Sequence, residues 1–422
     1  MTVEITTLGN GLRIVTHQMP HLETVSLGVW VACGARHESK AEHGISHLIE
    51  HMAFKGTKRR SARAIAEEIE QVGGELNAAT SLETTCYYAR VLKGDDTLAL
   101  DILADILLNS QHAPEELERE REVILQEIAA TRDSPDEIAY DLIHDVAFPG
   151  QPVGRPILGS PDSVKSFQTA DLSRFLGAHY GARRMVVSAA GAVEHARIVR
   201  HVEALFGGLT AGMAGSQEPA RYRGGTRASE KPFEQTHVLA GFQGPAYGRP
   251  EFFTGQVFSG LLGGGMSSRL FQEVRERRGL CYSIYSSSWG FNDSGLFCIH
   301  TATGTETMTE LIAVISGELK ALASDGPSPA EVARAKAQLK AGLLMSLESS
   351  GARAEQMARH LIAHNRLLTN AELISAVEDV TAARLRDFAG WLLTSGQPSV
   401  AVVGAGKSSM THAAALERVL AA

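Results

Sequence analysis

Cysteine is scarce in this sequence. Four cysteines occur among 422 residues, and none belongs to a CxxC pair. Such pairs are typical of thiolate zinc sites, and closely spaced cysteines are typical of small disulfide-rich domains. The sequence therefore predicts neither, and we interpret as buried thiols Cys33, Cys86, Cys281 and Cys298.

Long apolar runs and excess positive charge are also missing. No stretch reaches the roughly 18 apolar residues that a membrane helix needs. The first residues include Glu4 and lack the basic and apolar segments of a secretory signal. We therefore expect no membrane insertion and a cytoplasmic location, although a trimmed organellar form would look the same. The net charge of −8 argues against nucleic acid as a partner and leaves room for basic substrates.

What the sequence does contain is an internal repeat. Residues 163–193 and 376–406 share the pattern of an amphipathic helix followed by a short β-branched strand that runs into glycine. The stretch 211–232 is rich in Gly, Ala, Pro and charged residues and is typical of a linker. We therefore predict two similar domains, at 1–210 and 233–422.

Both predicted domains combine strands with helices. Each opens with an alternating strand, at 25–31 and at 237–242, and ends with the repeated helix and strand. Interspersed strands and helices favour an α+β fold, in which helices pack on a mainly antiparallel sheet, over a parallel doubly wound sheet. At 44% hydrophobic residues, the chain can bury a core in each domain.

One helix carries a concentrated set of chemical groups. Residues 42–53 place apolar side chains at helical spacing, and within about a 100° arc lie His47, Glu50 and His51. Two imidazoles at i and i+4 suit two ligands of one zinc ion. A carboxylate at i+3 lies beside the metal, where a general base would act on zinc-bound water. The alternative is a helix face with two solvated or hydrogen-bonded histidines.

The HLIEH motif and its surroundings carry a family resemblance. The order His-x-x-Glu-His is the inverted-zincin signature. GISHLIEHMAFKGT, residues 44–57, resembles the pitrilysin, insulin-degrading enzyme and mitochondrial processing peptidase family, most of all the β-type processing peptidases and their bacterial relatives. The resemblance covers nearly the whole chain. It implies a clamshell of two homologous domains, and a zinc-dependent endopeptidase that cleaves extended peptides or presequence-like segments within an enclosed chamber.

The same resemblance supplies the rest of a zinc site. Residues 114–131 form a predicted helix on which Glu116, Glu120 and Glu127 lie nearly in line. An ordinary solvated acidic face would look alike. The resemblance implies that Glu127 is the third ligand of one zinc ion per chain, and that Glu120 supports the site without binding the metal. Glu50 would then be the general base for the zinc-bound water that attacks the peptide.

Further residues follow from the family as substrate contacts. A glycine turn and a β-branched strand occur within 73–91. The resemblance implies an edge strand that pairs with an extended peptide, through Asn77, Ala78, Ala79 and Thr80. An interior strand is the alternative. The resemblance also implies that Arg275 and Tyr282 reach the scissile carbonyl, where both can donate hydrogen bonds to an oxyanion. From the sequence alone, Arg275 would pass for a surface residue.

The second half carries no equivalent of the motif. When the second half is aligned with GISHLIEH, the matching residues are VFSGLLGG. Gly260, Gly263 and Gly264 then stand near the positions of His47, Glu50 and His51. Only the N-terminal domain can therefore hold zinc by this motif. The run 263–270, GGGMSSRL, lacks the Gly-Lys-Ser/Thr ending of a phosphate loop.

Specificity and assembly are also expectations from the resemblance. Glu137 and Asp141 stand four apart on one helix face, where processing peptidases have acidic residues that receive an arginine preceding the cleavage site. A solvated acidic face is the alternative. Because one chain carries both HLIEH and the Arg275–Tyr282 pair, we expect a homodimer. The rival hypothesis is a non-catalytic scaffold or peptide-binding subunit, like the respiratory-complex core proteins of the family, which have eroded metal motifs.

Overall fold

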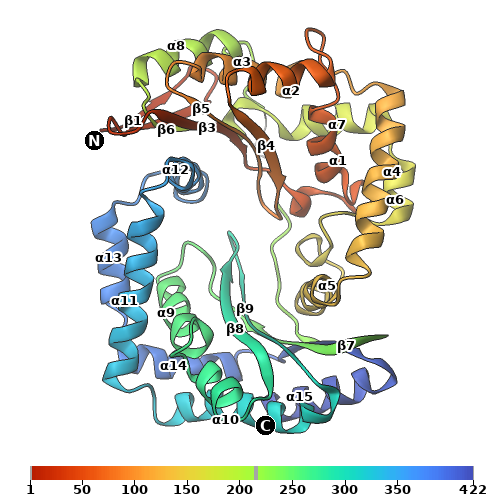
Figure 1. Cartoon of the computed structure of the whole chain (residues 1–422), viewed down its shortest axis with the longest axis vertical. Helices are drawn as coiled ribbons and strands as arrows, with labels where there is room; N and C mark the ends of the chain where they lie inside the picture. Colours follow the sequence, from red (N-terminus) through yellow and green to blue (C-terminus); the bar gives the residue numbers. More distant parts are fainter. Residues whose placement is uncertain (1, 213–216, 422) are drawn as a thin grey trace. The chain divides into compact units, whose positions relative to one another are not determined.

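The structure, a computed structural model, describes residues 2–212 and 217–421 (Figure 1). These residues form two units, each with its own sheet and hydrophobic core. Unit 1 comprises the described residues of Met1–Ile128, Pro156–Gln217 and Met345–Leu367. Unit 2 comprises those of Ala129–Arg155, Glu218–Leu344 and Leu368–Ala422. Neither unit is therefore continuous in the sequence.

Unit 1 contains a six-stranded sheet in the order β1-β2-β6-β3-β5-β4. Only β2 and β6 are parallel neighbours, and the other pairs are antiparallel. Along the chain, the strands are β1 (Val3–Thr7), β2 (Arg13–Gln18), β3 (Thr24–Val31), β4 (Glu75–Thr80), β5 (Thr85–Leu92) and β6 (Met185–Gly191).

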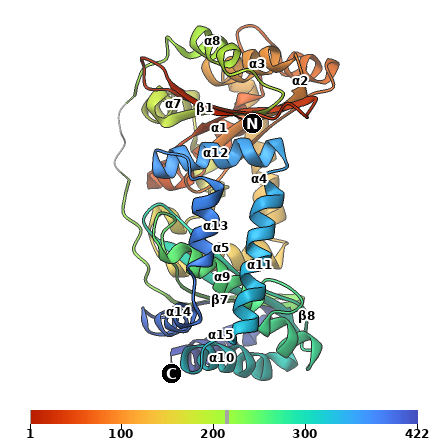
Figure 2. The same ribbon diagram turned by 90° about the vertical axis from the view of Figure 1, so that its left-hand side faces the viewer.

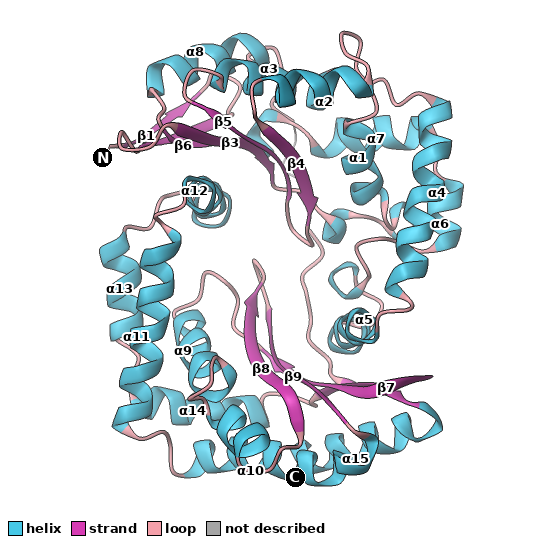
Figure 3. Ribbon diagram, viewed as in Figure 1, coloured by secondary structure: helices cyan, strands magenta, loops and turns pink. Residues whose placement is uncertain are grey.

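Helices cover both faces of this sheet (Figures 1 and 3). α3 and α8 pack on one face, against β3, β5 and β2, and α12 packs on the other, against β2, β3 and β6. Figure 2 shows α12 along its length. The helices of this unit are α1 (Ile45–Ala53), α2 (Ala62–Gln71), α3 (Asp96–Leu108), α4 (Pro114–Thr131), α6 (Pro161–Ser166), α7 (Thr169–His179), α8 (His195–Phe206) and α12 (Ser350–His364).

Unit 2 contains a four-stranded sheet in the order β10-β7-β9-β8. Its strands are β7 (Gly225–Gln243), β8 (Cys281–Gly290), β9 (Gly295–Thr303) and β10 (Ser399–Ala405). The long strand β7 meets β10 twice. Val400, for example, lies opposite both Thr226 and Ala240, and the second pairing runs in the reverse direction. β10 therefore lies between the two halves of β7.

The helices of unit 2 also lie on both faces of its sheet (Figure 3). α5 packs against β7 and β10 on one face, and α15 packs against the same strands on the other. The helices are α5 (Pro135–Ala147), α9 (Glu251–Gly263), α10 (Met308–Ser324), α11 (Pro329–Ser346), α13 (Asn370–Glu378), α14 (Ala382–Thr394) and α15 (Ser409–Ala421). Across residues 2–212 and 217–421, none of the helices has both the length and the apolar composition of a membrane span.

The two sheets share one topology. The strand order across the unit 2 sheet is the first half of β7, then β10, the second half of β7, β9 and β8. The strands of unit 1 that correspond in order and direction are β2, β6, β3, β5 and β4. The sequence repeat falls on the helix–strand pairs α7–β6 and α14–β10. The prediction of two homologous α+β domains with mainly antiparallel sheets is confirmed.

The units do not follow the predicted domain boundaries, because each half of the chain gives one helix to the other half's sheet. The buried side chains of α5 include Ala139, Ile143 and Val146, and this helix packs on the unit 2 sheet. α12 packs reciprocally on the unit 1 sheet. Residues 225–232 of the predicted linker belong to β7, and residues 213–216 lie outside the described part. Sequence position alone cannot reveal such an exchange.

The docking of α12 gives a testable prediction. Met357 on α12 is fully buried in a cluster with Trp30 and Val186 of the unit 1 sheet. Met357→Ala should destabilise the protein by about 2–5 kcal/mol, because it removes the thioether and leaves a cavity. Denaturant unfolding would measure this as a lower midpoint. Met345→Ala is the matched control, since Met345 is 68% exposed and the same truncation there should leave the midpoint nearly unchanged.

Candidate metal centre

The first turn of α1 is fixed by a buried carboxylate and a glycine. Glu38 accepts hydrogen bonds from the backbone N–H groups of Gly44 and Ser46, at 2.8 and 2.9 Å, and so satisfies donors that the helix leaves free. Gly44 has φ 93°, and a Cβ there would lie 2.7 Å from the Cα of Gly159. α1 therefore begins at a fixed point against the segment 156–161.

The apolar side of α1 holds the helix in the core and directs its polar side outward. Ile45, Leu48, Ile49 and Met52 are buried in the core of unit 1. The intervening positions carry His47, Glu50 and His51, each partly exposed. The imidazole rings of His47 and His51 lie with centroids 4.6 Å apart.

The structure brings Glu127 of α4 to these two histidines. The Nε2 atoms of His47 and His51 each lie 3.7 Å from an oxygen of the Glu127 carboxylate. The candidate ligand atoms of the three residues all lie within 4.8 Å of one another. In the described part of the chain, no other group of three His, Cys, Asp or Glu side chains meets so closely. Glu116, on the same line of α4, instead pairs with Arg119.

These three residues fit a zinc ion. Tetrahedral ligands at about 2.0–2.2 Å from zinc stand about 3.3–3.6 Å from one another, which is close to the separations between the Nε2 atoms and the carboxylate. Oε2 of Glu127 is buried and has no hydrogen-bond partner among the described residues. Burial, reinforced by His51, lowers the pKa of His47 to about 4, which keeps the imidazole neutral for coordination. Nε2 of each histidine and the Glu127 carboxylate would hold the metal.

Glu120 occupies the position expected of a supporting carboxylate. It lies two turns before Glu127 on α4, is 5% exposed, and its Oε2 atom lies 2.9 Å from Nδ1 of His51. A carboxylate can only accept at that distance, so Nδ1 carries the proton and Nε2 of His51 is left free for a metal. The other oxygen of Glu120 lies 2.6 Å from Nζ of Lys55.

Glu50 stands next to the metal group without belonging to it. Its carboxyl lies near Thr80, the last residue of β4, and near His51. Burial raises the pKa of Glu50, and Thr80 and His51 oppose part of that rise. A carboxylate that is free of the ligand set and has a raised pKa is suited to accept and return a proton.

β4 is the edge strand that the family resemblance implies. Among the described residues, it pairs with β5 and ends the sheet, so the alternative of an interior strand is wrong. Asn77 and Ala79 are exposed, Ala78 is buried and Thr80 is partly buried, as the alternation of a strand requires. The outer side of β4 therefore has no strand neighbour among the described residues, and a pairing peptide would compete there with the side chain of Asn77, whose Oδ1 accepts from the backbone N–H of Ala78 at 2.8 Å.

Arg275 and Tyr282 contact each other in unit 2. Arg275 lies on the short π-helical segment η5 (Phe271–Glu276), and its guanidinium stacks over the rings of Phe271 and Tyr282, at 4.6 and 5.2 Å. Tyr282, on β8, is 79% exposed. An aromatic side chain this exposed and held by a cation is suited to contact a ligand.

Glu137 and Asp141 also belong to unit 2, because α5 packs there. Tyr140 on this helix bonds the hydroxyl of Tyr285 at 2.7 Å, and His144 stacks on Trp289. Burial, together with the charge of Glu137, raises the pKa of Asp141 to about 6. The two carboxylates therefore repel each other, and a positively charged ligand would stabilise them.

Unit 2 has no room for a side chain at two of the three equivalent positions. A Cβ on Gly263 would lie 2.5 Å from the backbone N of Ser286 on β8, and one on Gly264 would lie 2.5 Å from Gly260. Ser259 and Ser286 bond across this contact, at 2.7 and 2.9 Å. Glycine is required because the edge strand lies directly against α9.

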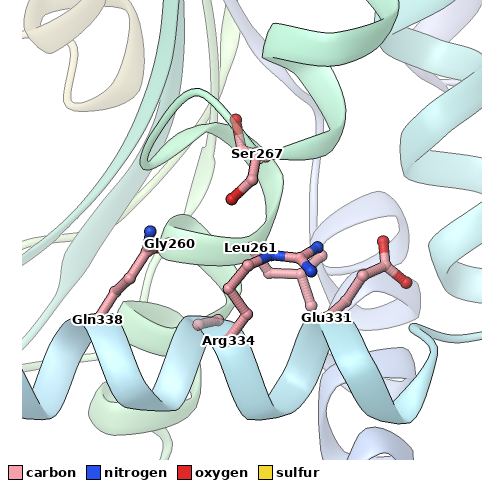
Figure 4. A pocket seen from close by; sticks show the side chains of 8 residues that line it. Gly260, Leu261, Ser267, Glu331, Arg334 and Gln338 are labelled. Carbon is pink, nitrogen blue, oxygen red and sulfur yellow. The ribbon is translucent and has the colours of Figure 1, made fainter.

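The cavity beside the glycine-rich run 263–270 is small. The cavity beside it, lined by Leu261, Ser267, Glu331, Arg334 and Gln338 among others, has a volume of about 10 Å³ (Figure 4). This is the room of a single water molecule, so a phosphate group would not fit.

Two residues near the metal group were not found from the sequence. Glu38 caps α1 from an upstream loop, and Lys55 holds Glu120 from the segment that follows α1. Lys55 lies four residues after His51, a spacing that could have indicated a shared side of the helix end. No local pattern marks Glu38, because its partners are backbone N–H groups.

The fold and this group together define a class of protein. Two equivalent α+β units, of which one carries a His-x-x-Glu-His helix beside a third carboxylate, are the arrangement expected of an inverted zincin. Comparisons with known proteins agree with this class.

Two family models match most of the chain. The model described as "Insulinase (Peptidase family M16)" matches residues 13–161, and "Peptidase M16 inactive domain" matches residues 166–339. An uncharacterized zinc protease of Rickettsia bellii is 38% identical over 401 residues, which cover 95% of this chain and 97% of that protein. One of Bacillus subtilis is 37% identical over 92% of this chain and 95% of its own length. The chain belongs to peptidase family M16, the insulinase family.

Solved structures show the same fold at lower identity. A protease from Helicobacter pylori superposes with a TM-score of 0.88 at 22% identity, over 95% of this chain and 99% of that one. A structure from Pseudomonas fluorescens, titled as a peptidase M16 inactive domain, gives 0.88 at 20% identity over 96% and 98%. The fold is therefore shared along nearly the whole chain.

The lowered pKa of His47 predicts acid sensitivity of the metal-free protein. Burial lowers the pKa of His47 to about 4, below the ordinary value near 6.5 of an unfolded chain. Between these values the unfolded chain binds a proton that the folded chain does not, so stability should fall as pH falls from about 6.5 to 4. Thermal unfolding across this range would measure it, and His47→Gln should flatten the fall. His21→Gln, at an exposed histidine, should leave the slope unchanged.

Proposed function

We propose that this chain is a zinc-dependent endopeptidase that cleaves extended peptides or presequence-like segments. The observation that carries the proposal is the convergence of two Nε2 atoms and the Glu127 carboxylate within 4.8 Å, with Glu50 beside them. The relatives, matched over nearly their whole length, are named zinc proteases, which supports the zinc peptidase part of the proposal.

The proposed chemistry divides between the metal and Glu50. When bound, zinc supplies a Lewis acid that polarises a peptide carbonyl and lowers the pKa of water. The Glu50 carboxylate then accepts a proton from the attacking water and later returns it to the leaving amine. The burial that raises the pKa of Glu50 makes its carboxylate a better proton acceptor than an ordinary glutamate.

The proposed substrate binds as an added strand. An extended peptide can pair with the edge of β4 through backbone hydrogen bonds. Such bonds do not depend on the side chains of the peptide. Asn77 and Ala79 face outward on one side of this strand, and its end lies at Glu50. We further propose that Arg275 and Tyr282 donate hydrogen bonds to the oxyanion that forms at the scissile carbonyl.

Glu50→Gln and Glu127→Gln together test the proposed activity. In Glu50→Gln, the new side-chain amide cannot accept the proton, so cleavage of an unstructured peptide should fall at least about 100-fold while zinc content stays at one ion per chain. Glu127→Gln removes an anionic ligand and should lose both zinc and cleavage. Metal analysis and a fluorogenic peptide assay, with and without chelator, would measure the two effects.

Glu122→Gln is the matched control, because Glu122 is an exposed residue on the same helix as Glu127. Full cleavage by Glu50→Gln would contradict the proposal. A wild-type protein that binds zinc and peptide without cutting would instead support the rival function, a non-catalytic peptide-binding subunit.

We also propose that Glu137 and Asp141 favour an arginine before the cleavage site. Two carboxylates on one side of α5 can accept the planar guanidinium in paired hydrogen bonds. The double variant Glu137→Gln/Asp141→Asn should lower the preference for arginine in a peptide library by roughly 10-fold, with little change for other peptides. In the wild type, the preference should weaken as pH falls through about 6, because Asp141 then gains a proton. An unchanged cleavage profile would exclude this role.

A further inference from the structure

Lys55 forms an ion pair with the oxygen of Glu120 that does not contact His51. Nζ of Lys55 lies 2.6 Å from Oε1 of Glu120, and Oε2 of the same carboxylate lies 2.9 Å from Nδ1 of His51. Each oxygen of Glu120 thus has its own donor. The side chain of Glu120 is 6% exposed and that of Lys55 is 30% exposed, so the ion pair is shielded on the carboxylate side.

Lys55 itself is fixed by the segment that follows α1. Its backbone N–H donates to the carbonyl of Met52, and the next residue, Gly56, has φ 110°. Thr57 then donates from its hydroxyl to the fully buried carboxylate of Asp105, at 2.7 Å. Asp105 also accepts from Arg60 at 3.0 Å. The lysine therefore extends from a segment that is anchored on both sides.

The charge of this site requires a cation near Glu120. A buried carboxylate that loses its partner retains its desolvation cost without compensation. Glu127 and Glu50 add two further carboxyl groups around the same histidine pair. Without Lys55, Oε1 of Glu120 would have no cation, and the carboxylate would be free to turn away from Nδ1 of His51.

We propose that Lys55 is a positioning residue for the metal centre. It holds Glu120 in the one orientation that accepts the Nδ1 proton of His51, and it keeps that carboxylate apart from the ligand group formed with Glu127. Through this contact, Lys55 keeps Nε2 of His51 directed at the metal. This inference rests on the proposed zinc site, but it concerns metal affinity and does not require peptide cleavage.

Lys55→Met tests the inference by zinc affinity. Methionine keeps the length of the side chain and removes the charge, so affinity should fall about 10-fold or more, as for other residues that orient a metal ligand. Competition with a chromophoric chelator would measure it. Lys55→Arg should restore most of the affinity. Lys58→Met is the matched control, since Lys58 is exposed three residues away, and it should bind zinc as the wild type does.

A double-mutant cycle with Glu120→Gln separates positioning from a general structural role. The glutamine side chain of that variant can still accept from His51 through its carbonyl oxygen and leaves no buried charge, so adding Lys55→Met should cause no further loss of affinity. If Lys55→Met alone does not fold, the comparison of Glu120→Gln with the double variant still tests the positioning role.

Two results would overturn the inference. One is wild-type zinc affinity in Lys55→Met, and the other is an equal loss from Lys55→Met in the Glu120→Gln background. A wild-type protein that binds zinc but cleaves nothing would contradict the proposed function while leaving the role of Lys55 measurable.

Discussion

The metal centre depends on the burial of two apolar helix faces in one core. Leu48 and Met52 of α1, and Ile124 and Ile128 of α4, belong to the same hydrophobic cluster of unit 1. Their burial leaves each helix little freedom to rotate, so the polar side chains between them must meet. The convergence of two imidazoles and a carboxylate is costly without a metal, because buried atoms such as Oε2 of Glu127 have no hydrogen bond from the described residues. Core packing thus supplies the free energy that holds an unsatisfied site ready for an ion.

Unit 2 shows how the same helix and edge strand pack when the side chains of the metal group are replaced by glycine. α9 and β8 in unit 2 correspond to α1 and β4 in unit 1, but Gly263 stands where unit 1 has Glu50. With no side chain in the way, the edge strand closes on the helix, and Ser259 and Ser286 bond directly. The same topology therefore carries the metal group beside its edge strand in one unit and a direct contact between helix and edge strand in the other. The difference lies in side-chain volume at a few positions.

The sequence predicts most of this because the relevant signals are local or repeated. The histidine spacing on α1, the helix over residues 114–131 and the repeated helix–strand pairs all follow from periodicity. Periodicity does not show that Glu127 lies close to the histidines in space, because it says nothing of how two separate helices pack. The family resemblance supplied that prediction. Glu38 and Lys55 were missed because they act through backbone groups and through a second carboxylate. Such contacts depend on where loops return in space, which a single sequence does not encode in any short pattern.

The exchange of α5 and α12 separates the chemistry from the sequence halves. Glu137 and Asp141 follow α4 closely in the chain, yet the packing of Ile143 and Val146 makes them part of unit 2. The metal group belongs to unit 1, whose sheet in turn holds α12 from the second half. The metal group depends on the core of unit 1, whereas the position of the acidic pair depends on the packing of α5 in unit 2, so substitutions in one unit can affect either group without the other.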